Sequence, residues 1–120
     1  MHWKLPLLLL AAPLLALAQT SPPTRTTDGV LTDPTGMTLY TNDTDAPLRS
    51  GCAGDCARAW PPLLAEASAK PWAEYAPFAR ADGTRQWAYK GKPLYRHARD
   101  QAAGDRNGDG ADNAWRVAAP

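Results

Sequence analysis

Short runs of apolar and β-branched residues follow one another along most of the chain, separated by turns that contain glycine or proline. Residues 30–32 (VLT) and 37–41 (MTLYT) flank the sequence Asp33-Pro34-Thr35-Gly36. Proline at the second position and glycine at the fourth are typical of a type I turn. The pattern therefore predicts that the two runs pair as a β-hairpin.

A second hairpin is predicted further along the chain. Residues 86–89 (QWAY) and 93–97 (PLYRH) flank Lys90-Gly91, a shorter turn in which the glycine can adopt a positive φ. Pro93 has no amide hydrogen to donate, which favours the start or the edge of a strand. Residues 115–117 (WRV) are predicted to form a further strand.

Proline positions also predict short helices. Residues 56–60 can form one that ends before Pro61-Pro62, and residues 63–70 can form another that ends before Pro71. The predicted fold class is therefore mainly β, a small α+β domain. Two sequence-related β-hairpin units pack together in it, with short helices in the connection.

Seven positions of the first hairpin region return in the second. The pairs are Asp28 and Asp82, Gly29 and Gly83, Gly36 and Gly91, Leu39 and Leu94, Tyr40 and Tyr95, Asp45 and Asp100, and Trp60 and Trp115. Such fixed-period similarity marks a duplicated unit, and two copies are too few for an open solenoid. We therefore expect one domain, residues 28–118, with repeats 28–60 and 82–115 joined by a Pro/Ala-rich connection, 61–81.

Residues 1–18 have the features of a secretory signal peptide. Lys4 precedes an apolar run of Leu, Ala and Pro, and Ala16-Leu17-Ala18 forms an A-x-A cleavage site. The run is shorter than the ~20 apolar residues that a membrane-spanning helix needs. Residues 19–27 (QTSPPTRTT) then resemble a flexible leader.

These features predict the compartment. The residue directly after the cleavage site is Gln19 and not a cysteine, so no thiol is available there for bacterial lipid attachment. We expect a soluble, exported bacterial protein, periplasmic or extracellular, with no transmembrane anchor after signal cleavage.

The charge distribution argues against a nucleic-acid binder. Removal of the signal peptide takes away Lys4, one of the 13 Lys and Arg residues. The 12 basic residues that remain equal the 12 Asp and Glu residues in number. The basic residues are scattered, whereas nucleic-acid binding requires them to cluster on one face. The chain after the signal peptide has nine Trp, Tyr and Phe residues, so a small core built on large rings is expected.

Cys52 and Cys56 are the only cysteines of the chain. In an exported protein such a pair is expected to form a disulfide, with a stabilisation at the low end of ~2–4 kcal/mol because the loop is short. Cys-x3-Cys is also a copper-binding spacing, and soft thiolates select Cu(I). In that alternative His97 or Met37 would complete the ligand set, although Trp60 stands where a binuclear site would have histidine.

A second candidate site is an acidic loop near the C-terminus. Asp105, Asn107 and Asp109, followed by Gly110, match the opening D-x-N-x-D-G of a calcium loop, and Asp112 adds a nearby oxygen. Arg116 occupies the position of the bidentate glutamate, and no amphipathic helices flank the loop, so it is not an EF-hand. The alternative is a polar turn whose side chains bond to their own backbone.

The repeated Tyr-x4-Asp also has two interpretations. Tyr40 with Asp45, and Tyr95 with Asp100, could form two equivalent ligand sites. Alternatively, each tyrosine packs in the core with its hydroxyl on the following aspartate or on a backbone group. Because the repeat register aligns Cys52 with Asn107, the cysteine loop and the acidic loop occupy equivalent places, which favours a structural role for both.

These motifs together resemble a family of secreted repeat proteins of unknown function, described as predicted lipoproteins with a Y-x-[FWY]-x-x-D motif. Its typical elements correspond here to GMTLYTNDTD, CAGDCARAWPPL, DGTRQWAYKGKPLY and GDRNGDGADNAW. Asn42 and His97 replace the middle aromatic of the motif, and no lipid-attachment cysteine is present. The resemblance implies an exported envelope protein and no established activity.

No catalytic motif is visible: the chain contains no G-x-S-x-G, no H-E-x-x-H and no phosphate loop. We therefore expect a non-catalytic binding or interaction module, with an envelope protein or a small ligand as its partner and with no cofactor assigned. The first alternative is a periplasmic copper or redox accessory protein that uses Cys52 and Cys56. The second is an enzyme of unknown type.

Overall fold

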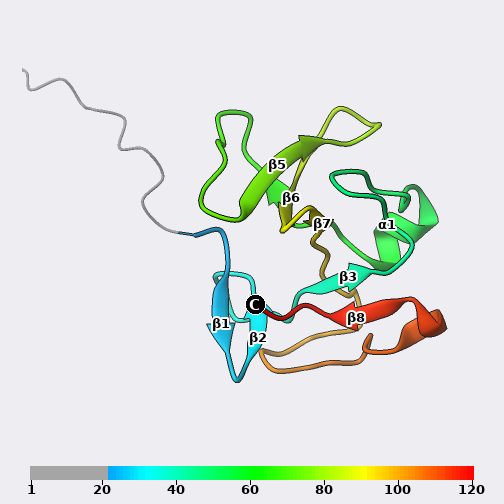
Figure 1. Cartoon of the computed structure of the whole chain (residues 1–120). Helices are drawn as coiled ribbons and strands as arrows, with labels where there is room; N and C mark the ends of the chain where they lie inside the picture. Colours follow the sequence, from blue (N-terminus) through cyan, green and yellow to red (C-terminus); the bar gives the residue numbers. More distant parts are fainter. Residues whose placement is uncertain (1–21) are drawn as a thin grey trace, which may run out of the picture.

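Strands provide most of the regular structure of residues 22–120, which are the residues that the computed structural model describes (Figure 1). They form small antiparallel sheets with few helical residues, so the mainly β prediction is confirmed. The predicted signal peptide, 1–18, and the first residues of the leader, 19–21, lie outside the described part of the chain.

The first sheet begins earlier than predicted. β1 (Arg25–Thr27) pairs with β2 (Val30–Thr32) through a turn in which Asp28 and Gly29 have φ of 51° and 76°. Two positive φ values in a two-residue loop match the twist of the flanking strands. This turn therefore allows residues 25–27 to pair with β2 as a strand. Thr24 is buried and its hydroxyl lies 2.5 Å from that of Tyr75. The prediction of a flexible leader over residues 19–27 is therefore wrong for residues 24–27.

The predicted turn at residues 33–36 is confirmed. The Gly36 amide donates to the Asp33 carbonyl oxygen at 3.0 Å, and the Asp33 carboxylate accepts the Thr35 and Met37 amides. The return strand divides, however. Leu39 still pairs with Leu31, whereas β3 (Tyr40–Asn42) pairs with β8 (Trp115–Val117), the strand predicted there.

The second hairpin is confirmed and is part of a larger sheet. β6 (Arg85–Tyr89) pairs with β7 (Lys92–Pro93) across Lys90-Gly91, and on another side with β5 (Tyr75–Ala79). Both turn residues have positive φ, 50° and 81°. β5 lies within the predicted connection, so repeat 2 begins earlier than expected.

The connection contains strands in place of the predicted helix over residues 63–70. β4 (Leu64–Ala65) pairs with β6, and Leu63 bonds through its backbone to Leu94 and Trp87. Residues that precede a proline disfavour helical backbone, and Pro61-Pro62 comes directly before this segment. The backbone groups of residues 63–65 are satisfied instead by pairing at the edge of the sheet. The helix predicted at 56–60 is confirmed as α1 (Asp55–Ala59), and an unpredicted 3-10 turn, η1, spans Ala111–Asn113.

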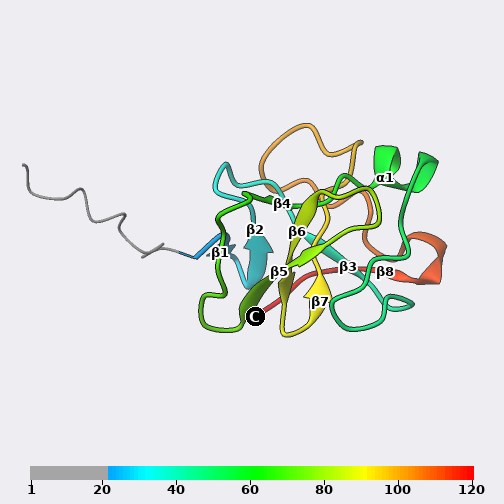
Figure 2. The ribbon, with the colours of Figure 1, turned by 90° about the horizontal axis from the view of Figure 1, so that it is seen from above.

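Each repeat pairs with a strand from the other, and the two sets of contacts are similar. Tyr40 and Tyr95 pair directly, with N–H to carbonyl distances of 2.8 and 2.9 Å. Leu63, which follows repeat 1, lies between strands of repeat 2, and Ala118, which follows repeat 2, bonds in the same way to Leu39 and Leu31 of repeat 1. Figure 1 shows β3 beside β8 at this junction, and Figure 2 shows the same pair from above.

Two buried clusters make up the core. One lies among the sheets, and the other lies at the junction of the repeats, where Tyr40, Cys52, Trp60, Tyr95 and Trp115 pack together. The junction cluster thus contains all four repeated aromatic residues, as well as one of the cysteines.

Candidate functional site

The repeated tyrosines and aspartates meet at the junction, but with exchanged partners. The Tyr40 hydroxyl donates to Asp100 Oδ2 at 2.6 Å, and the Tyr95 hydroxyl donates to Asp45 Oδ2 at 2.6 Å. The tyrosines are buried, as expected, and their hydroxyls are satisfied by carboxylates. The predicted alternative placed each hydroxyl on the aspartate that follows it or on a backbone group. The aspartate comes instead from the other repeat, and the Tyr40 hydroxyl also accepts the backbone amide of Gly108 at 3.3 Å.

The surroundings keep both hydroxyls protonated. Burial, followed by the hydrogen bond to Asp100, raises the pKa of Tyr40 well above its usual 10.0. Burial and the bond to Asp45 raise the pKa of Tyr95 in the same direction. Near neutral pH the tyrosines are therefore fixed hydrogen-bond donors, which is a structural role.

The repeated tryptophans stack on each other. The Trp60 and Trp115 ring centroids are 3.8 Å apart and the ring planes differ by 2°. Tyr40 meets Trp60 edge-on at 5.3 Å, and Tyr95 meets Trp115 edge-on at 4.9 Å. Edge-to-face contacts of this kind stabilise aromatic clusters beyond the area they bury.

His97 belongs to this packing. Its ring lies 4.2 Å from that of Trp60 and 6.0 Å from that of Tyr40, and its Nδ1 is buried without a hydrogen-bond partner. The backbone of Gly108 lies close to both rings, since a Cβ on that glycine would lie 2.5 Å from Trp60 Cη2 and 3.1 Å from His97 Cγ. His97 thus occupies the place of the aromatic residue that the Y-x-[FWY]-x-x-D motif has there.

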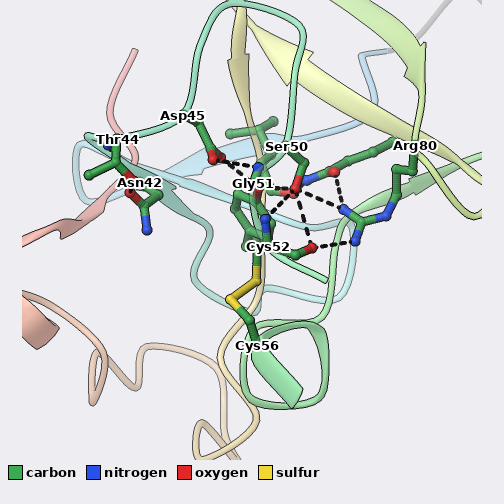
Figure 3. Close-up of a disulfide and its surroundings, with 11 residues drawn as sticks. Asn42, Thr44, Asp45, Ser50, Gly51, Cys52, Cys56 and Arg80 are labelled. Carbon is green, nitrogen blue, oxygen red and sulfur yellow. Dashed lines mark hydrogen bonds between the residues drawn. A yellow bond between two sulfur atoms is a disulfide. The ribbon is translucent and has the colours of Figure 1, made fainter. Parts of the chain in front are cut away.

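Cys52 and Cys56 form a disulfide, as predicted, with the sulfurs 2.03 Å apart (Figure 3). Copper binding requires thiolates, which a disulfide lacks. Within residues 22–120, no group of three or more histidine, cysteine or acidic side chains is placed to hold a metal ion. The alternative ligand set of Cys52, Cys56 and His97 is therefore not brought together.

Arg80 holds the disulfide loop from the side. Its guanidinium donates to the Cys52 carbonyl oxygen at 2.7 Å, to Gln86 Oε1 at 2.5 Å and to Ser50 Oγ at 3.2 Å. Figure 3 shows Arg80 directed toward Ser50 and Cys52. All three acceptors are neutral, and Arg80 forms no salt bridge with a carboxylate of the described residues. Ser50 Oγ also lies 2.6 Å from the Tyr95 hydroxyl, which links this loop to the junction.

A cavity of about 110 Å³ adjoins this arrangement. The turn after β5 forms one wall and the start of α1 forms the other. Its lining residues are Ser50, Cys52, Ala53, Gly54, Ala57, Arg80, Ala81 and Asp82.

Comparison with known families agrees with this duplicated architecture. The family model described as a secreted repeat of unknown function matches residues 24–64 and again residues 77–119. The chain belongs to this family. No curated protein and no solved structure matches it.

The secreted-repeat match also refines the repeat boundaries. The first matched segment begins just before the hairpin that carries the Asp-Gly turn, and the second begins within the corresponding hairpin, in β5. The first ends at the start of β4 and the second ends after β8, the two strands that pair with the other repeat. In residues 22–120, no helix is both long and apolar enough to cross a membrane.

The acidic loop of the second secreted repeat uses its side chains internally. Asp105 Oδ2 accepts the Gln101 and Ala102 amides, which lowers the pKa of that carboxyl, and Asp109 Oδ1 accepts the Val117 amide. Asn107 donates its backbone and side-chain amides to Asp100 Oδ1, both at 3.0 Å. Asp112 lies in η1 with a φ of 51°. Three of the four predicted calcium ligands, Asp105, Asn107 and Asp109, thus act as hydrogen-bond partners within the fold, as in the polar-turn alternative.

The equivalence of the two loops is visible in their contacts with the repeated aspartates. Asp45 Oδ1 accepts the Gly51 amide at 2.9 Å beside the disulfide, and Asp100 Oδ1 accepts the Asn107 amide, one residue further along the corresponding loop. Each repeated aspartate therefore binds a tyrosine of the other repeat and a loop amide of its own.

Three residues of this region were not predicted from the sequence. Ser50 and Arg80 lie in loops and match no motif, so no local signal identified them. Gly108 was visible within the D-x-N-x-D-G pattern, but its close approach to Trp60 depends on a contact between the repeats.

Proposed function

We propose that the protein is a non-catalytic module, exported to the bacterial envelope, that binds a partner through the disulfide-loop face of its first repeat. One observation carries this proposal: the polar residues common to both repeats bond to one another across the junction. By contrast, Ser50, Cys52 and Arg80 line a cavity that opens on the surface.

The available side chains support a non-catalytic role. An acid–base mechanism needs a group whose pKa lies near the working pH, whereas Tyr40 and Tyr95 are shifted away from it. Asp45 and Asp100 each accept hydrogen bonds from a tyrosine and from a loop. The cysteines, joined in a disulfide, supply no nucleophilic thiolate.

The size of the cavity favours a protein partner over a free cofactor. Small-molecule sites are typically ~300–1,000 Å³, whereas this cavity has a volume of about 110 Å³. A single polar side chain of a partner protein fits that volume. Arg80 and Asp82, both on the wall formed by the turn after β5, would supply donors and an acceptor.

Site-specific photocrosslinking in the producing cells tests this proposal. A photoreactive residue at the exposed cavity residue Ala53 is expected to give one discrete protein adduct, and the same residue at Ala102 in the second repeat is expected to give none. Ala57→Leu fills the cavity wall without removing a hydrogen bond and should abolish the adduct, whereas the surface control Ala102→Leu should retain it. Equal labelling at both positions, or an adduct unaffected by Ala57→Leu, would refute this binding face.

Export is tested separately by mass spectrometry of the intact protein. We expect the mature chain to begin at Gln19, in a fraction released without detergent. A chain that retains residues 1–18 would contradict signal cleavage.

A further inference from the structure

Neither repeat is complete without the other. Tyr40 and Tyr95 take their carboxylate partners from the opposite repeat, and the sheet of each repeat gains a strand from the other. A repeat alone would leave a buried hydroxyl and a strand edge without partners, which is costly. The two surfaces that meet at the junction are thus made for each other.

The contacts are nearly the same in both directions. The Leu63 amide donates to the Leu94 carbonyl oxygen at 2.9 Å, and the Ala118 amide donates to the Leu39 carbonyl oxygen at 2.8 Å. Such reciprocity is the geometry of a two-fold interface between subunits, except that here one chain supplies both halves. Nothing in these contacts requires the two repeats to belong to the same chain.

The connection between the repeats has two unlike parts. Residues 66–69 are held against β6, because Arg85 Nη1 donates to the carbonyl oxygens of Glu66, Ala67 and Ala69. Residues 70–74 form an exposed turn closed by two backbone bonds between Trp72 and Tyr75, at 2.8 and 2.9 Å. Opening this turn would also move the half-buried Trp72 away from the core cluster and break the bond from the Lys90 amide to the Glu74 carbonyl oxygen at 2.9 Å.

The turn also contains backbone strain. Ala73 has a φ of 50°, a left-handed conformation that strains the backbone of a residue with a Cβ. Extension of residues 70–74 would release that strain at the expense of the two Trp72–Tyr75 bonds, the Tyr89 and Lys90 bonds to Glu74 and the packing of Trp72. Strained hinges of this kind favour domain swapping.

We propose that a second copy of this chain is a binding partner, through exchange of repeats. Residues 70–74 extend, and repeat 1 of each chain packs on repeat 2 of the other. Each half of the dimer then rebuilds the Tyr40–Asp100 and Tyr95–Asp45 bonds and the Trp60–Trp115 stack. Because those contacts are equal in the monomer and the dimer, protein concentration during folding selects between them.

Crosslinking between two differently substituted full-length chains tests the exchange. Thr41 and Arg116 are paired residues of β3 and β8, on opposite repeats. Directly opposite strand residues have Cα separations within the range that a disulfide spans. Chains with Thr41→Cys and chains with Arg116→Cys are unfolded together, refolded and oxidised. A 41–116 link between two chains is expected, with a yield that rises with concentration.

A chain that carries both substitutions is the geometric control, because it can close the 41–116 bridge by itself. If it does so while the mixed chains give no intermolecular link, repeat exchange is refuted. If the bridge forms in neither sample, the solution mass of the unsubstituted chain decides. A monomer after refolding at both low and high concentration rejects the proposal, and a dimer at high concentration supports it.

Substitution of the hinge gives a second readout on the otherwise native chain. Ala73→Gly removes the left-handed strain and should lower the dimer fraction about tenfold. Ala69→Gly, in the same connection but with no positive φ, should leave it nearly unchanged. Equal effects of the two substitutions would show that hinge strain does not favour the exchange.

Discussion

The Tyr40 hydroxyl lies 2.6 Å from Oδ2 of Asp100, an aspartate of the other repeat. Tyr95 has the same relationship to Asp45. The duplicated motif therefore serves to join the two repeats, and the fold depends on both copies. The proposed functional residues lie where the copies differ.

A double-mutant cycle can verify this exchanged pairing. Tyr40→Phe should destabilise the protein by about 1–3 kcal/mol, because Asp100 is buried and loses its partner. Combined with Asp100→Asn it should show a coupling of about 1 kcal/mol, whereas the combination with Asp45→Asn should be nearly additive. Denaturant unfolding measures these terms. Stronger coupling of Tyr40 to Asp45 than to Asp100 would contradict the exchange.

Alkaline pH should weaken the junction. The pKa values of Tyr40 and Tyr95 are raised in the folded protein above the usual 10.0, so folding favours the protonated hydroxyls. Their contribution to stability is fully present below about pH 10 and is lost as the pH rises above it.

The matching measurement is the free energy of unfolding across the alkaline range. The wild type should lose stability above about pH 10 more steeply than the variant with both Tyr40→Phe and Tyr95→Phe. The same slope in both proteins would show that other groups cause the alkaline loss.

Gly108→Ala should be strongly destabilising. The added methyl group would lie 2.5 and 2.8 Å from atoms of the Trp60 ring, which is stacked on Trp115 and cannot move away freely. Overpacking of this kind costs about 1–3 kcal/mol or more. Gly51→Ala, in the loop of the first repeat, is the control, since its methyl group would meet Asp45 Oδ1 at an ordinary 3.5 Å. Similar melting temperatures for the two variants would contradict the predicted clash.

The acidic loop should respond to acid rather than to calcium. Two amide hydrogen bonds lower the pKa of Asp105, so its contribution is present above the usual 3.8 and is lost as the pH falls below it. Asp105→Asn should speed hydrogen exchange at the Gln101 and Ala102 amides. A rise in melting temperature with millimolar calcium, lost in the variant with Asp105→Ala and Asp109→Ala, would instead establish the calcium site.

Local turn chemistry made part of this fold predictable. Pro34 and Gly36 specify one hairpin turn and Gly91 the other, because φ restrictions act within a few residues. β4 was not predictable in the same way, since Leu64 pairs with Gln86, far along the chain. Tertiary pairing there overrides the local preference for a helix.

The candidate site shows the same division. The disulfide could be predicted, because the compartment and the cysteine count are properties of the sequence. The partners of Tyr40 and Tyr95 could not, because equal spacing in two repeats does not reveal which repeat supplies each acid. Arg80 gave no signal either, since its role depends on the Cys52 carbonyl of a distant loop.

Reduction of the disulfide should loosen the first repeat selectively. The bond closes a short loop, so we expect the free energy of unfolding to fall by ~2 kcal/mol, the low end for disulfides. The Cys52 amide, which donates to Ser50 Oγ, should then exchange faster, whereas the Asn107 amide, bound to Asp100, should keep its protection. This selectivity follows because only the first loop depends on a covalent link. Equal loss of protection in both loops would mean that the junction transmits the change, and two free thiols in the purified exported protein would reopen the copper alternative.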